Sequence, residues 1–177
     1  MGKVVTLGEI MLRLSPPGQS RIFQAQSMEV NYGGAEANVA VSLAQFGHKV
    51  SFVSRVPDNA LGDAALGVLK KYNVDCSHIA RGGERLGIYF LENGASVRPS
   101  SVVYDRKYSS FSKMEADGLD FDGIFSGCRL VPYFRDHPGV KSFLRPFKPG
   151  SCKSGKGPGR NRIFGSELPE TLVGGAY

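Results

Sequence analysis

The chain has 177 residues, of which 41% are hydrophobic and 21% charged, and this is the composition of a globular protein with a core of its own. No apolar run approaches the roughly 20 residues that a membrane-spanning helix needs, so a membrane protein is not expected. The formal charge of +6 is concentrated at one end: residues 1–130 carry 14 Lys and Arg against 13 Asp and Glu, whereas residues 131–177 carry 8 against 3.

The first part of the chain alternates between strand and helix patterns. Residues 4–14 are an apolar stretch that predicts one buried strand, closed by the turn sequence SPPG. Residues 22–32 predict a second extended stretch, and two glycines then lead into a helix over residues 35–46. A strand over residues 50–56 and a helix over residues 60–72 follow. This order of elements indicates an α/β fold with a parallel sheet.

The pattern then changes to a hairpin. Residues 86–104 show hydrophobic alternation on both sides of Asn93-Gly94, a dipeptide that favours a tight turn between strands. We interpret this hairpin as a small lid projecting from the main sheet. Residues 111–124 resemble an acidic helix or loop, and another strand is expected in the sequence IFSGCRL that ends at Leu130.

Periodicity is lost after residue 130. Residues 131–177 contain six prolines and eight glycines, and no part of them matches a helix or strand for more than about one turn, so we expect a disordered tail. The tail also imitates a phosphate-binding loop in GSCKSGKG, but Gly157 replaces the hydroxyl residue that would hold magnesium, and Pro158 stands where a helix should begin. A phosphate loop is therefore not expected.

The ends and the cysteines suggest an intracellular protein without a structural metal. The sequence MGKVVTLGEI enters a strand directly and has no signal-peptide pattern, which predicts a cytoplasmic location. Cys76, Cys128 and Cys152 are widely spaced and form no CxxC pair, so we interpret them as reduced, packed thiols.

The most informative short motif is NYGGAEAN at residues 31–38. Gly33 and Gly34 allow a polar ligand to approach the backbone, and the helix that follows presents free N–H groups and the positive end of its dipole. Glu36 and Asn38 add polar side chains at the same place. A plain turn and helix start is the alternative interpretation of a pair of glycines.

Four segments in order make the interpretation more specific. They are GEIMLRLSPPG, NYGGAEANVAVSLAQFG, SRVPDNALGDAAL and GIYFLENGASVRPSSVVYDR. Together they resemble the ribokinase-like (PfkB) sugar kinases over residues 1 to about 130, and within these the kinases of 2-keto-3-deoxygluconate (2-dehydro-3-deoxygluconate). The resemblance implies a doubly wound α/β sheet with a β lid, here truncated after its first half. It also implies a sugar acid as substrate, ATP and Mg²⁺ as cofactors of the intact kinase, and a homodimer formed through the lid.

The resemblance also implies roles for individual residues. Gly34 would contact the sugar through its backbone, with Gly33, Glu36 and Asn38 shaping the same pocket. The residues expected to hold the oxygens and the carboxylate of the substrate are Tyr89, Tyr104 and Arg106. This agrees with their chemistry, because a guanidinium pairs a carboxylate with fixed geometry and a tyrosine hydroxyl both donates and accepts. A solvated surface arginine is the alternative for Arg106.

The sequence departs from the family in its last quarter. The family's catalytic base is an aspartate in a late GAGD motif, and no GAGD occurs in the 177 residues, so no catalytic residue and no ATP-binding residue is expected in this chain. Read one nucleotide later, degenerate codons for VPYFRDHPGVK permit Phe-His-Ile-Ser-Gly-Ile-Thr-Pro-Ala-Leu, which resembles the family's continuation. Codons for GSELPETLVGG permit Asp-Leu-Asn-Tyr-Arg-Lys-Leu-Trp-Ser-Val-Glu in the same shift. We therefore expect a frameshift near Leu130 or Val131.

The sequence predicts a fragment of a sugar-acid kinase that does not turn over. Residues 1–130 would be its sugar-binding part, and residues 131–177 an out-of-frame tail. One alternative is a kinase of the same family acting on fructose, ribose or a nucleoside. Another is a non-catalytic module whose basic tail grips nucleic acid, which is not expected because the charge is confined to the tail.

Overall fold

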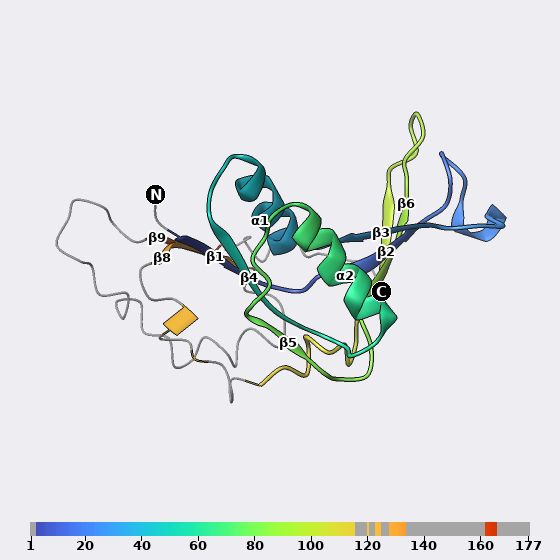
Figure 1. The fold of residues 1–177 in the computed structure, drawn as a ribbon. Helices are drawn as coiled ribbons and strands as arrows, with labels where there is room; N and C mark the ends of the chain where they lie inside the picture. Colours follow the sequence, from blue (N-terminus) through green and yellow to red (C-terminus); the bar gives the residue numbers. More distant parts are fainter. Residues whose placement is uncertain (1–2, 116–119, 121–122, 125–127, 134–161, 166–177) are drawn as a thin grey trace.

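Two β-sheets and two helices make up the described part of the molecule (Figure 1). One sheet carries both helices, and the other extends away beyond them. In this computed structural model, the residues that the structure describes are 3–115, 120, 123–124, 128–133 and 162–165.

The larger sheet is parallel and has five strands in the order β5-β4-β1-β8-β9. Its strands are β1 (Lys3–Leu7), β4 (Val50–Val56), β5 (Ile79–Arg81), β8 (Cys128–Tyr133) and β9 (Arg162–Gly165). The chain builds outward from β1 to β4 and β5, and then returns to place β8 on the other side of β1. This reversal is the defining feature of a doubly wound sheet, and it puts the topological switch point between β1 and β8.

Helices α1 (Ala35–Gln45) and α2 (Ala60–Lys71) pack on one face of this sheet. The side chain of Asn59 caps α2 by accepting hydrogen bonds from the backbone N–H groups of Leu61 and Gly62, both at 3.1 Å. Small alanines on both helices allow close approach to the sheet, where Phe52 is fully buried. The core therefore lies between α1, α2 and the alternate side chains of β1 and β4.

The second sheet has four strands in the order β3-β2-β6-β7, and we refer to it as the lid sheet. Its strands are β2 (Met11–Ser15), β3 (Glu29–Gly33), β6 (Ile88–Glu92) and β7 (Ser101–Asp105), with a 3₁₀ turn η1 (Ile22–Gln24) between β2 and β3. The pairs β2–β3 and β6–β7 are antiparallel, whereas β2–β6 is parallel. Leu12, Tyr32 and Ile88 on one face join the core cluster, which leaves the opposite face outside this cluster.

Most of the predicted elements are confirmed. The helices over 35–46 and 60–72, the strand over 50–56 and the two antiparallel strands of the hairpin over 86–104 all form. The tight turn expected at Asn93-Gly94 is wrong, because residues 93–100 separate the two strands and the bend lies between the bridged residues Ala95 and Arg98. The single strand predicted over residues 4–14 is wrong, because the chain leaves the large sheet after β1 and enters the lid sheet as β2. The expected extended stretch over residues 22–32 is interrupted, since η1 occupies its start.

The tail differs from expectation in two segments. Strand β8 continues to Tyr133, and β9 pairs with it in parallel from Leu130–Arg162 to Tyr133–Gly165. The apolar residues of the sequence RIFG suit such a strand. The remainder of the expected disordered tail lies outside the described residues.

Candidate functional site

The predicted site residues gather at the carboxyl end of β1, where the chain crosses from one sheet to the other. In doubly wound folds ligands bind outside the carboxyl ends of the strands at the switch point. Residues 8–10 make this crossing, and β3 brings Gly34 of the NYGG sequence back against them. The position of the site is therefore set by both sheets.

Gly34 lies in direct contact with the crossing. A Cβ built on it would overlap the carbonyl oxygen of Glu9 and would lie 3.2 Å from the Glu9 carbonyl carbon and 3.6 Å from Ile10 Cα. Gly34 precedes α1, and its carbonyl accepts a hydrogen bond from Asn38 N at 2.8 Å. Close packing is the reason that glycine is required here. The backbone angle is not, since a φ of −179° is an extended conformation that any residue can adopt.

Gly33 faces the side chains expected around the sugar. A Cβ at this position would lie 3.3 Å from Asn38 Oδ1 and 3.6 Å from the hydroxyl of Tyr89. The glycine thus keeps open the space between the start of α1 and the lid sheet. Glu36, also predicted for the site, is buried with its carboxylate against Gly8. Glu36 therefore packs against the segment of residues 8–10 that connects the two sheets.

The lid sheet brings the remaining predicted residues together. Tyr89 on β6 pairs directly with Tyr104 on β7, and their ring centroids are 5.9 Å apart. The guanidinium of Arg106 lies 5.1 Å from the centre of the Tyr104 ring, a cation–π distance. Its Nη1 atom is 4.0 Å from Oε2 of Glu9, which is only 4% exposed.

These contacts link most of the predicted site residues into a ring. From Gly33 the ring passes to Tyr89 and Tyr104, then to Arg106, and through Glu9 back to Gly34. The ring offers hydroxyl groups, one guanidinium and close access to backbone. Such a set can bind a small polyhydroxylated molecule that carries an anionic group.

Two residues of this region were not among the predicted site residues. Glu9 is nearly buried and holds the position of Arg106, and Arg13 lies on β2 directly opposite Tyr89. The sequence GEIMLRL contains both, but each acquires its role through partners that are far away in the chain. The register of β2 with β6 is the signal that reveals Arg13.

An ion pair stabilises the base of the lid hairpin. Arg85 donates from Nη2 to Oδ2 of Asp105 at 2.7 Å and from Nη1 to Oδ1 at 3.0 Å. These hydrogen bonds lower the pKa of Asp105 below its usual value and raise that of Arg85. The bidentate pair orients the end of β7 immediately before Arg106.

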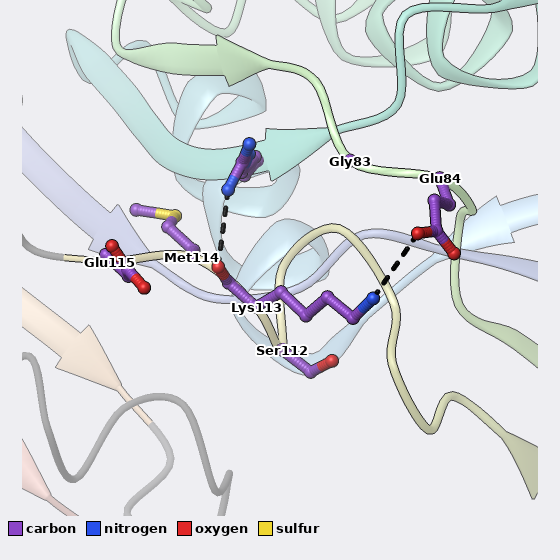
Figure 2. A pocket seen from close by; sticks show the side chains of 7 residues that line it. Gly83, Glu84, Ser112, Lys113, Met114 and Glu115 are labelled. Atoms are coloured by element: carbon purple, nitrogen blue, oxygen red, sulfur yellow. Dashed lines mark hydrogen bonds and ion pairs between the residues drawn. The ribbon is translucent and has the colours of Figure 1, made fainter.

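A separate pocket of about 510 Å³ lies away from this ring (Figure 2). Lys113 extends across it towards Glu84, with its Nζ atom 3.6 Å from Oε1, and Arg55 donates to the Lys113 carbonyl at 3.3 Å. None of the seven predicted substrate residues lines this pocket. It is an open surface feature in which acidic and basic side chains already pair with each other.

The described residues contain no group of three or more His, Cys, Asp or Glu that could hold a metal ion. None of the helices in the same part of the chain is long and apolar enough to cross a membrane. Cys76 is half-buried, which raises the pKa of its thiol, and Cys128 is buried.

The fold and the ring of residues define a sugar-kinase-like α/β domain with a β lid. Comparison with known proteins identifies its family: residues 1–126 match the pfkB family carbohydrate kinases, and the chain belongs to this family. This confirms the family and the fold expected from the sequence.

Individual relatives agree with this placement. The crystal structure of 2-dehydro-3-deoxygluconokinase from Thermotoga maritima is 50% identical and superimposes with a TM-score of 0.78, over 82% of this chain and 47% of that one. The 2-dehydro-3-deoxygalactonokinase of Haloferax volcanii is 37% identical over 68% of this chain. A sugar kinase from Pyrococcus horikoshii, solved in complex with ATP, is 25% identical with a TM-score of 0.71 over 81% of this chain and 48% of that one.

The match is confined to the first part of these relatives. The chain spans 38% of the length of the Haloferax kinase. It spans 36% of the 5-dehydro-2-deoxygluconokinase of Clostridium perfringens, to which it is 31% identical over 68% of its own length.

Proposed function

We propose that this chain is the sugar-binding part of an ATP-dependent kinase of 2-dehydro-3-deoxygluconate. The family is that of carbohydrate kinases, and two of the relatives carry names of 2-dehydro-3-deoxy sugar-acid kinases. The intact enzyme would transfer the γ-phosphoryl group of ATP, with Mg²⁺, to a hydroxyl of the sugar acid.

The position of Arg106 is the observation that supports a sugar acid as the substrate. Its guanidinium lies 5.1 Å from the centre of the Tyr104 ring and 4.0 Å from buried Glu9, beside the two predicted tyrosines. A neutral sugar needs no cation there, whereas the carboxylate of a sugar acid is bound well by a guanidinium. This favours the sugar acid over the fructose, ribose or nucleoside alternatives.

Isothermal titration calorimetry on the 177-residue chain tests the proposal. We expect 2-dehydro-3-deoxygluconate to bind and D-fructose to bind much more weakly. Arg106→Ala should weaken binding of the acid by roughly 10-fold or more, since a hydrogen bond to a charged group contributes about 1.5–3 kcal/mol. Lys107→Ala is the matched control because it removes the neighbouring exposed cation. Equal binding of acid and neutral sugar would refute the substrate class.

We further propose that the chain binds sugar without phosphorylating it. The family's GAGD motif, which carries the aspartate that accepts the proton of the sugar hydroxyl, does not occur in the 177 residues. Without this base the bound sugar has no group to activate it for attack on ATP. A coupled assay of ADP release with the sugar acid should show no turnover. Clear turnover by the purified chain would contradict this proposal.

The lid sheet also supports the proposal of a homodimer. Strand β7 is an edge strand, and its Val102 and Val103 are 44% and 53% exposed. Edge strands with exposed apolar side chains are prone to pair with another chain. Sedimentation equilibrium of the wild type and of Val103→Lys should show a dimer that the substitution disrupts; a monomeric wild type would oppose it.

A further inference from the structure

The lid sheet contains a second guanidinium on its ligand-facing side. In the register of the sheet, Arg13 on β2 stands directly opposite Asn31 on β3 and Tyr89 on β6, and Tyr89 stands opposite Tyr104 on β7. Residues directly opposite one another on neighbouring strands project from the same face of a sheet. The four side chains therefore form one polar row across all four strands.

The row lies on the face that the core does not use. Leu12 and Ile88, the neighbours of Arg13 and Tyr89 in the chain, belong to the buried cluster on the other face. The hydroxyl of Tyr89 reaches the space in front of Gly33. Neighbouring strands are about 4.8 Å apart, so the Arg13 backbone lies one strand spacing from that of Tyr89.

The charge of Arg13 has no acidic partner in the described part of the chain. Its Nε atom is buried and makes no hydrogen bond there, and none of the ion pairs found among these residues includes it. Arg85 and Arg98, by contrast, each pair with a carboxylate at 2.7 Å. Partial burial of a charge is unfavourable unless an opposite charge accompanies it.

We infer that Arg13 is a specificity-determining residue that binds the anionic substrate together with Arg106. The inference rests on the proposed function, since the sugar acid supplies the missing negative charge. Arg106 is already accompanied by Glu9, whereas Arg13 contributes a positive charge with no acidic partner among the residues that the structure describes. Arg13 lies next to Tyr89 across the sheet and Arg106 lies next to Tyr104, so the two arginines flank the tyrosine pair over which the acid would lie.

Calorimetry with 2-dehydro-3-deoxygluconate and D-fructose tests the role of Arg13 in the full chain. Arg13→Ala should weaken binding of the acid roughly 10- to 100-fold, the range expected for a lost hydrogen bond to a charged group. Arg13→Lys keeps the charge but not the planar donor set, so its affinity for the acid should lie between those of the wild type and Arg13→Ala. Arg21→Ala is the control, because it removes an exposed arginine at the far end of the lid sheet without touching the row.

The outcomes separate the two proposals. Acid binding by the wild type that survives Arg13→Ala within about twofold, as in the control, overturns the role of Arg13 and leaves the proposed function standing. A wild type that prefers the neutral sugar overturns both. Circular dichroism and the melting temperature of each variant identify a folding defect; if Arg13→Ala is unfolded, the Lys variant decides, and unchanged acid binding by a folded Arg13→Lys overturns the inference.

Discussion

Gly34→Ala is expected to damage both the stability and the site of this protein. The added Cβ would overlap the carbonyl oxygen of Glu9, which is backbone and cannot rotate away as a side chain would. Either α1 or the crossing segment must shift, and overpacking of this kind costs about 1–3 kcal/mol. For a chain of this size, each kcal/mol lowers Tm by roughly 2–4 °C.

The same shift should also weaken the binding of the sugar acid. The start of α1 carries Asn38, and displacing this side chain should weaken binding roughly 2- to 10-fold, the range for one lost hydrogen bond. Urea unfolding followed by circular dichroism measures the loss of stability, and calorimetry with the sugar acid measures the loss of binding.

A second glycine provides the control for this substitution. Gly67 lies inside α2, and a Cβ there would meet nothing within 4 Å. Gly67→Ala should therefore stabilise the protein by about 0.5–1 kcal/mol, because glycine is unfavourable within a helix. If Gly34→Ala is as stable as Gly67→Ala and binds the acid equally well, then Gly34 does not pack against the Glu9 carbonyl and the reasoning is refuted.

Three further predictions concern other parts of the chain. Asp75→Ala should destabilise by about 1–3 kcal/mol at neutral pH, because buried Ser51 donates to this carboxylate and would lose its acceptor. Burial tends to raise the pKa of Asp75, but the hydrogen bonds from Ser51 and Ser77 outweigh it and lower that pKa, so urea midpoints of wild type and variant should converge as the pH falls below about 4. Tyr89→Phe should weaken binding of the sugar acid several-fold and leave Tm nearly unchanged, as calorimetry and thermal melts would show. An unaltered affinity would mean that the Tyr89 hydroxyl does not contact the substrate. Resequencing around codon 130, with peptide mass spectra of the expressed protein, should reveal a shifted frame after Leu130, and an uninterrupted in-frame reading of residues 131–177 would oppose it.

The elements with a clear period were predictable from the sequence. The 3.6-residue spacing of α2 and the alternation within β6 and β7 each depend on neighbours in the chain, so local sequence is sufficient. The turn expected at Asn93-Gly94 lies further along, at residues 95–98. The division of residues 4–14 between two sheets was not predictable in this way. Both β1 and β2 are apolar, and only the tertiary structure shows that they pair with different partners.

The site was predictable to the extent that it follows from family motifs and glycines. Gly33, Gly34, Tyr89 and Arg106 are linked by contacts in the structure, and their role in binding substrate stays a prediction. Arg13 could not be found because its significance depends on a pairing between strands that are far apart in sequence. The burial of Glu9 was likewise not predictable, since burial depends on packing between elements.

The parallel pairing of β2 with β6 has a consequence for the order in which the lid sheet assembles. Each antiparallel pair, β2–β3 and β6–β7, joins segments close in sequence, whereas β2–β6 joins Leu12 to Ile88 across all the elements from β3 to β5. Closing so long a loop is slower than forming local pairs, so this seam should form late in folding and open early. A molecule bound on both sides of the seam would hold it shut, and hydrogen exchange of the β2 and β6 amides would slow when the ligand is present.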